Sequence, residues 1–193
     1  NGRALKAGDV LPVLRAFELP QERFRPLQKR VQAAALEDWA LTTLTPHGFI
    51  GAQKFPLLRV VLGPQDDAFT EKGLFDFKSA LYTVTQDSNR MAAKLSGAPI
   101  EAKAGVDILS DGIVEGSVQV SANGQPIVML ADHQSTGGYA KIATVIPCDI
   151  PALAQVRPGQ LVGFRVVSVE EGAEACRKEK EKWTYLKEAI DHD

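Results

Sequence analysis

Three short segments of the chain carry polar side chains suited to binding a small amide or anionic ligand. They are residues 63–67 (GPQDD), residues 82–91 (YTVTQDSNRM) and residues 119–141, the last preceded by residues 107–112 (DILSDG). Each segment follows or contains an apolar run that indicates a strand, so the polar groups are expected at strand ends. Side chains placed on loops by a rigid scaffold can converge on one ligand.

The third segment is the densest. An apolar run at residues 127–131 leads into polar residues and then into a Gly-Gly pair, which we expect to form a turn where backbone N–H groups can approach a ligand closely. Lys141 adds a cation. A plain hairpin turn is the alternative interpretation. The candidate binding residues of this segment are Gln119, Gln134, Ser135, Thr136, Gly137 and Gly138.

In the first segment, Gln65 offers both a donor and an acceptor, which suits an amide, lactam or ureido ligand. Asp66 and Asp67 would point in different directions on extended backbone, so we expect only Asp67 to face a site. Alternatively, these carboxylates cap a helix that begins near Thr70.

In the second segment, Arg90 follows Ser88 and Asn89 at the entrance to a strand. A guanidinium can hold a carboxylate through two parallel hydrogen bonds, and Ser88 and Asn89 are candidate substrate-binding residues beside it. The alternative is a structural ion pair between Arg90 and Asp87 or another carboxylate. Asp67, Arg90 and Lys141 are the candidate catalytic residues.

The elements around these segments are short strands separated by turn residues. The expected strands are residues 56–62, 82–85, 91–95, 116–120, 127–131, 140–146 and 161–169. Helices are expected at residues 27–43, 70–81, 149–155 (with Asp149 as its cap) and from residue 170 onward, and a short strand at residues 10–17. The last helix either binds a partner or packs on the domain. The pattern predicts a mostly antiparallel sheet closed into a barrel or folded into a sandwich.

Composition and missing motifs exclude several classes of function. The formal charge of -2 favours neither nucleic acid nor an anionic membrane, and no apolar run is long enough to span a bilayer. Cys148 and Cys176, in different local settings, predict no disulfide framework, so we expect a reducing cytoplasm. The histidines and cysteines lack the spacing of metal ligands. The sequence also lacks three motifs: a Walker loop for ATP hydrolysis, a Gly-x-Ser-x-Gly elbow for a serine nucleophile, and a Met-Lys-Met biotin attachment site.

The order and spacing of the motifs between Leu57 and Val167 resemble the biotin-dependent carboxyltransferase-domain family, which includes the C subunit of 5-oxoprolinase and the second subunit of allophanate hydrolase. The GPQDD form is more similar to the 5-oxoprolinase member than to urea carboxylase. The resemblance implies a mostly β fold, a cyclophilin-like closed β-barrel with a few helices. It also implies that the chain corresponds to the C-terminal half of the family's tandem arrangement.

This resemblance predicts four parts of the chain. Residues 1–17 would be the end of a preceding, largely absent half, and residues 18–55 a linker with a helix. Residues 56–169 would form the barrel domain, and residues 170–193 a C-terminal helix.

The resemblance implies one component of an ATP-dependent 5-oxoprolinase-type complex, which opens the lactam of 5-oxoproline to glutamate and is inactive without its partners. Those partners would be a small related barrel protein and a lactam-hydrolase protein, similar to the B and A subunits of 5-oxoprolinase. No cofactor is expected on this chain alone; ATP, or carboxybiotin on another chain, is implied for the complex. The alternatives are a carboxyltransferase component acting on urea or another amide, and a non-enzymatic regulator that binds a histidine-kinase inhibitor.

Overall fold

The structure is a computed structural model that describes residues 55–191. Three predictions lie outside the described residues: the strand at residues 10–17, the helix at residues 27–43 and the boundary between residues 17 and 18. The barrel expected at residues 56–169 falls inside the described residues, as does the C-terminal helix up to residue 191.

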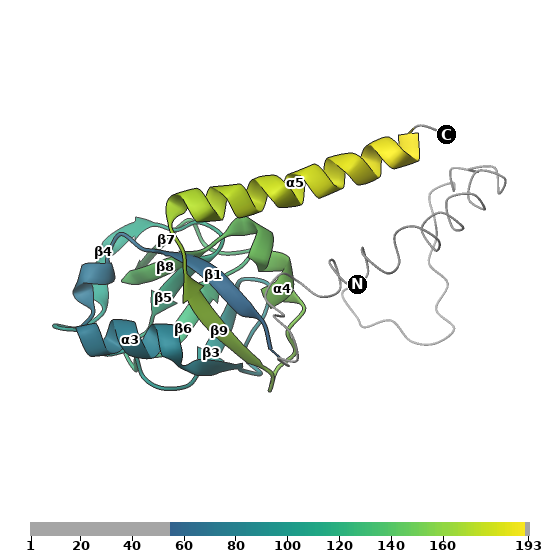
Figure 1. The fold of residues 1–193 in the computed structure, drawn as a ribbon. Coiled ribbons are helices and arrows are strands. Elements are labelled where there is room, and N and C mark those ends of the chain that lie inside the picture. The colour runs from purple at the N-terminus through teal and green to yellow at the C-terminus, as the bar shows by residue number, and fades with distance from the viewer. Residues whose placement is uncertain (1–54, 192–193) are drawn as a thin grey trace, which may run out of the picture. The chain divides into compact units, whose positions relative to one another are not determined.

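Seven strands close into a barrel, which confirms the predicted mostly β fold class and rules out the sandwich (Figure 1). In spatial order they are β1 (Leu57–Leu62), β8 (Lys141–Val145), β5 (Ser117–Val120), β6 (Pro126–Met129), β3 (Ala92–Ser96), β2 (Leu81–Val84) and β9 (Leu161–Val166). All neighbouring pairs are antiparallel except β1 and β9, whose parallel pairing closes the barrel.

A separate two-stranded antiparallel sheet lies outside the barrel order. It consists of β4 (Asp107–Gly112) and β7 (Thr136–Tyr139), and the sequence predicted neither strand. β4 is mostly exposed and β7 contains two glycines, so neither has the apolar alternation that identifies a half-buried strand. The Gly-Gly pair is therefore strand rather than turn, and both the turn and the hairpin interpretation are wrong.

The two short helices expected at residues 70–81 and 149–155 are both present, and a 3-10 helix precedes each of them. The 3-10 helix η2 (Asp66–Ala68) precedes α3 (Glu71–Ser79), whose N-cap is Thr70: its side chain accepts a hydrogen bond from the Gly73 amide at 3.0 Å. The 3-10 helix η3 (Pro147–Asp149) runs into α4 (Ile150–Ala154). Asp149 occupies the N-cap position of α4, but its side chain makes no capping hydrogen bond, because it binds Arg59 instead.

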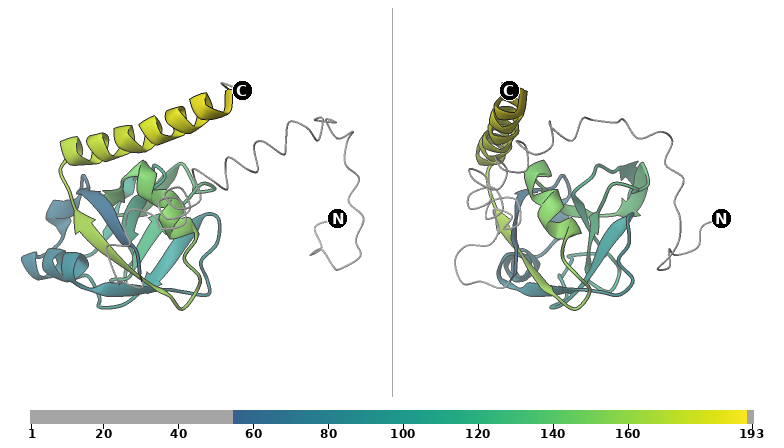
Figure 2. Two further views of the ribbon diagram at one scale, coloured as in Figure 1. Left: turned by 45° about the vertical axis from the view of Figure 1, so that its right-hand side comes forward. Right: turned by 90° about the vertical axis from the view of Figure 1, so that its right-hand side faces the viewer.

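The charged C-terminal segment forms one continuous helix, α5 (Val169–Asp191), which packs against β1 and η3. Figure 2 shows α5 beginning beside the barrel in both views. Its packing fits the prediction of a helix that rests on the domain; a role in binding a partner stays a prediction.

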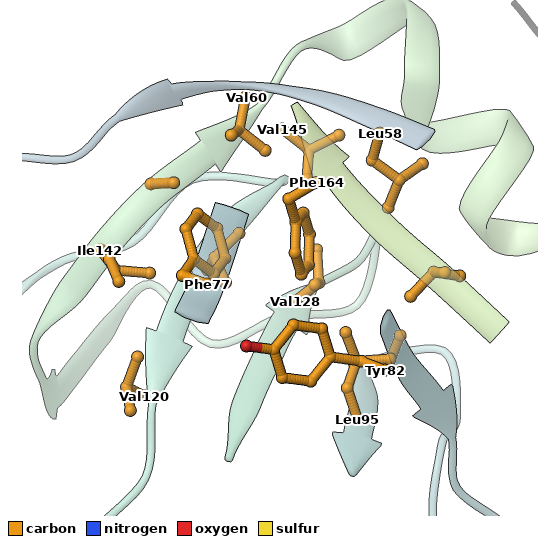
Figure 3. Packing of buried hydrophobic residues seen from close by; sticks show 14 of the residues in the cluster. Leu58, Val60, Phe77, Tyr82, Leu95, Val120, Val128, Ile142, Val145 and Phe164 are labelled. Carbon is orange, nitrogen blue, oxygen red and sulfur yellow. The ribbon is translucent and has the colours of Figure 1, made fainter. Parts of the chain in front are cut away.

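Aromatic and aliphatic side chains fill the inside of the barrel (Figure 3). Phe77 of α3 stacks on Phe164 of β9 with ring centroids 4.6 Å apart, and the Tyr82 ring of β2 lies 5.8 Å from that of Phe164. All three side chains are buried. Because the interior is occupied by apolar side chains, polar groups that could bind a ligand must lie at its edges.

Candidate functional site

Lys141 is the first residue of β8, and its buried ammonium group lies among polar groups at one edge of the barrel. It lies 2.5 Å from a carboxylate oxygen of Asp111 on β4 and donates to the Gly112 carbonyl oxygen at 2.7 Å. The Lys141 side chain is 6% exposed, whereas that of Asp111 is 53% exposed. The pair therefore joins a buried positive charge to a carboxylate that water or a ligand can reach.

Gln65 binds both partners of this pair from the loop after β1. Its side-chain oxygen accepts a hydrogen bond from the Lys141 backbone amide at 3.1 Å, and its Nε2 donates to Asp111 at 3.4 Å. Gly63 brings the loop close to β8, because a Cβ at this position would lie only 2.3 Å from the Lys141 carbonyl oxygen. Two residues 76 positions apart in the sequence are thus in direct contact.

Gln119 on β5 is the second amide side chain at this edge. It is 3% exposed, and its Nε2 donates to the Tyr139 carbonyl oxygen at 3.2 Å. The register of β5 against β8 shifts between Val118 and Gln119, after which Gln119 pairs with Lys141. Such irregularities re-aim side chains at the rims of barrels, and this one places the amide beside the strand position that carries the cation.

The register of β4 against β7 also shifts, between Asp107 and Asp111. Asp111 then pairs with Gly137 of β7. Both irregular ladders thus contribute to one cluster, which we call the Lys141 cluster: Gln65, Asp111, Gly112, Gln119, Gly137 and Lys141.

Electrostatics keep the Asp111 carboxyl ionised. Its hydrogen bond from Lys141 lowers its pKa, and the Gly112 amide, the Lys141 charge and the Gln65 amide lower it further. The cluster therefore combines an ammonium, a carboxylate and two amide side chains. Such groups can orient a planar N–C=O group and stabilise negative charge that develops on its oxygen.

Gly137 has a steric role in this cluster that differs from the predicted one. A Cβ at Gly137 would lie 2.5 Å from Cδ1 of Ile113 and 2.8 Å from Nε2 of Gln119. Gly138 has more space, since the nearest atom to a Cβ there would be the Ile108 carbonyl oxygen at 3.5 Å. The ends of two side chains cover the first glycine and would have to move if it carried a side chain.

We expect Gly137→Ala to destabilise the protein by about 1 kcal/mol, the low end of the usual cost of overpacking, because the added methyl group must displace only the ends of the Ile113 and Gln119 side chains. The matched control is Gly138→Ala, which adds the same methyl group to the same strand with ordinary contacts. Urea unfolding of both variants measures the difference. Equal losses at the two positions would contradict the steric argument.

Asp67 lies apart from the Lys141 cluster. It is exposed, sits in η2 rather than on extended backbone, and makes no side-chain hydrogen bond or ion pair within residues 55–191. The expectation of extended backbone at Asp66 and Asp67 was wrong, because the loop after Gly63 coils immediately into a 3-10 helix. The helix cap is Thr70 rather than either carboxylate. A catalytic role for Asp67 stays a prediction.

The second segment forms a structured loop at another surface position. Arg90 pairs with Asp132 at 3.0 Å, and its side chain is 84% exposed, which fits the structural ion pair considered above. Ser88 exchanges two hydrogen bonds with the backbone of Lys94, and Asn89 accepts from the amides of Met91 and Ala92. Local backbone contacts thus occupy Ser88 and Asn89; their roles toward a substrate stay predictions.

The remaining candidates lead from β6 into β7. Gln134, Ser135 and Thr136 are exposed, and the carbonyl oxygen of Ser135 accepts a hydrogen bond from the Ile113 amide at 2.9 Å. Thr136 pairs with Gly112, one residue beyond Asp111. This segment therefore adjoins the Lys141 cluster along the β4–β7 sheet, with its side chains open to solvent.

Sequence reasoning missed Asp111 as a site residue. Residues 107–112 stood out as polar, but nothing in the sequence showed that they form a strand or that this strand pairs beside Lys141, 30 residues after Asp111. A short polar segment between two expected strands, with an aspartate next to a glycine, was the available signal.

Within residues 55–191, no group of three or more His, Cys, Asp or Glu side chains is placed to hold a metal ion. A helix long and apolar enough to cross a membrane is likewise not found in this part of the chain.

The chain is similar to named proteins over most of its length. It is 38% identical over 145 residues to the C subunit of 5-oxoprolinase from Haemophilus influenzae, covering 74% of this chain and 47% of that protein. It is 36% identical over 126 residues to the C subunit of 5-oxoprolinase from Escherichia coli, covering 65% of this chain and 40% of that protein. The chain thus spans less than half the length of these relatives.

Solved structures support the fold. The Kluyveromyces lactis urea amidolyase structure matches with a TM-score of 0.60 and 21% identity, over 64% of this chain and 8% of that one. The family model described as carboxyltransferase domain, subdomain A and B, matches residues 1–166. The matched region is thus the N-terminal part of this chain, and correspondence to the C-terminal half of the family's tandem arrangement stays a prediction. Because the match covers more than half of its residues, this chain belongs to the carboxyltransferase-domain family.

Proposed function

We propose that this chain is the carboxyltransferase-domain component of an ATP-dependent 5-oxoprolinase-type complex, which opens 5-oxoproline to glutamate in the cytoplasm. The complex would contain a small related barrel protein and a lactam-hydrolase protein, and ATP would be consumed by the assembly rather than bound by this chain alone. The two relatives named as C subunits of 5-oxoprolinase support this assignment.

The observation that carries the proposal is the Lys141 cluster. A nearly buried ammonium contacts a half-exposed carboxylate, with the amides of Gln65 and Gln119 beside them. A lactam presents one N–H donor and one carbonyl acceptor, which matches this set of carboxylate, amide and ammonium groups. In the proposed reaction, Lys141 stabilises negative charge on the lactam oxygen, and Asp111 and Gln65 hold Lys141 in place.

The site is expected to be complete only in the assembly. The Asp111 side chain faces solvent on one side, and the exposed residues Gln134, Ser135 and Thr136 adjoin it along the sheet. A partner protein that covers this edge would exclude water, which strengthens electrostatic interactions in the site. Arg90 would hold the substrate carboxylate if the partner brings that carboxylate to its loop.

The test is reconstitution of the full chain with the two partner proteins, ATP and 5-oxoproline. We expect ATP-dependent glutamate formation that requires all three proteins, and strong loss of that activity when Lys141 is replaced. Lys94→Met is the matched control, since Lys94 is an exposed lysine on β3. Glutamate formation that is unaffected by omission of this chain would refute the proposal, and full activity of Arg90→Ala would remove Arg90 from the site.

A biotin-dependent carboxyltransferase is the second candidate. It is favoured by the description of the matching family model and by the fold shared with urea amidolyase. The same cluster would then orient urea or another amide toward carboxybiotin carried by another chain. Transfer of labelled carboxyl from carboxybiotin to an amide, without glutamate formation from 5-oxoproline, would select this candidate. If neither reaction occurs in any assembly but the chain binds a partner stably, a non-enzymatic regulator would be favoured.

A further inference from the structure

Two cysteines far apart in the sequence meet at the junction of the barrel and α5. Cys148 in η3 and Cys176 in α5 have their Sγ atoms 3.4 Å apart, and both are free thiols of intermediate burial. The sequence predicted that they lie in different local settings. They do lie in different elements, but nothing in the sequence indicated that η3 and α5 pack against each other.

Gly172 explains how α5 comes close enough for this contact. A Cβ at Gly172 would lie 3.0 Å from Cγ2 of Ile146, so the helix backbone runs directly over the residue before η3. Gly172 and Cys176 are four residues apart and share one face of the helix. The close approach at Gly172 thus sets Cys176 against Cys148.

The other side of the pair is also held in place. Asp149, next to Cys148, is 2% exposed and accepts hydrogen bonds from the backbone amide and the guanidinium of Arg59 on β1. Nη2 of Arg59 also donates to Cys148 Sγ at 3.5 Å. Both sulfur atoms are therefore positioned by packed elements rather than by loose side chains.

We propose that Cys148 and Cys176 form a dithiol modification site, which a low-molecular-weight disulfide such as oxidised glutathione converts into an intramolecular disulfide that joins α5 to the barrel. This site is separate from the Lys141 cluster and does not depend on the proposed function.

The reaction consists of two thiol–disulfide exchanges. The Cys176 thiolate attacks one sulfur of oxidised glutathione, forms a mixed disulfide and releases one glutathione thiolate. Cys148 then attacks the Cys176 sulfur, forms the Cys148–Cys176 bond and releases the second glutathione. The two protein thiols lose two electrons and two protons in total, and oxidised glutathione takes them up as two molecules of glutathione.

The order of the two steps follows from the surroundings of Cys148. Burial raises the pKa of its thiol to about 12, so this sulfur is a poor first nucleophile at neutral pH. The Arg59 guanidinium stabilises the Cys148 thiolate when it forms in the second step. Cys176 is therefore expected to react first.

The test treats the reduced full chain with oxidised glutathione, alkylates the remaining thiols and identifies the cysteine peptides by mass spectrometry. We expect a Cys148–Cys176 cross-link in monomeric protein, with little retained glutathione. Cys148→Ser should accumulate glutathione on Cys176, whereas Cys176→Ser should stay largely unmodified. Wild-type protein that keeps two alkylatable thiols, or stable glutathione adducts, would refute the proposal.

A second measurement tests whether the two thiols can form their bond without distorting the native fold. The bond closes a loop between η3 and α5, so the oxidised protein should unfold at a Tm roughly 5–10 °C higher than the reduced protein. Dithiothreitol should reverse the shift, and neither serine variant should show it. A cross-linked protein with an unchanged or lower Tm would contradict the proposed geometry.

Discussion

Replacing Lys141 with methionine should lower the rate of 5-oxoproline opening in the reconstituted complex by about 10²–10³-fold, the effect of removing one group that stabilises developing negative charge. Methionine retains most of the buried aliphatic volume, and Asp111 can be solvated because its side chain is 53% exposed. The variant should therefore fold. Steady-state glutamate formation at saturating ATP measures the loss, with Lys94→Met as the control that keeps full activity.

The same substitution has a second readout that does not depend on activity. The Asp111 pKa, now held below its ordinary value mainly by Lys141, should rise in Lys141→Met, and an NMR titration of the carboxyl measures it. A pKa lowered on folding means that the pair stabilises the folded state above the unfolded pKa, and that this contribution is lost as the pH falls through the folded pKa. An unchanged Asp111 titration would show that the contact between Lys141 and Asp111 is not made in solution.

Asp149→Ala should cost about 3–5 kcal/mol of unfolding free energy, because it leaves the largely buried Arg59 guanidinium without its charge partner. Three hydrogen bonds are lost at once, from the Arg59 amide at 2.8 Å, Nε at 3.0 Å and Nη2 at 2.5 Å. These bonds tie β1 to η3. Urea unfolding measures the loss.

The control for this prediction removes both charges. Arg59→Met combined with Asp149→Leu leaves no unpaired charge, so the double variant should be markedly more stable than Asp149→Ala. Reversal of the Lys72–Asp76 pair of α3, whose lysine side chain is 69% exposed, should change stability by less than about 1 kcal/mol. If Asp149→Ala loses no more than this surface pair, the Arg59–Asp149 contact is not a stabilising element.

The sequence predicted a mostly antiparallel sheet, a barrel or a sandwich, because that prediction rests on local patterns. Alternating or short apolar runs identify strands, and turn residues between them limit where strands end; Gly124 and Gly159 do adopt the positive φ expected at such turns. The start of α3 was predicted near Thr70 from the helical pattern that follows it, and Thr70 is its cap. The choice of a closed barrel over a sandwich followed only from the family resemblance.

The site was predicted less well. Lys141, Gln65 and Gln119 were identified by residue type. Gln65 does contact Lys141, and Gln119 pairs with Lys141 in the β5–β8 ladder. Their partner Asp111 was missed, and Gly137 was assigned to a turn that is a strand. The reason is that β4 and β7 are stabilised by each other. Their pairing depends on contacts between residues distant in sequence, which propensity does not describe.

The sequence by itself determined the fold class, the family and the residue types that could bind an amide. Only the tertiary structure decided which of those residues share an edge. Two register shifts bring Asp111, Gln119 and Lys141 together. The absence of a side chain at Gly63 lets the loop that carries Gln65 lie against β8. The packing of α5 on η3 places Cys176 beside Cys148. Each of these juxtapositions depends on the fit of backbone against backbone, which local sequence patterns do not encode.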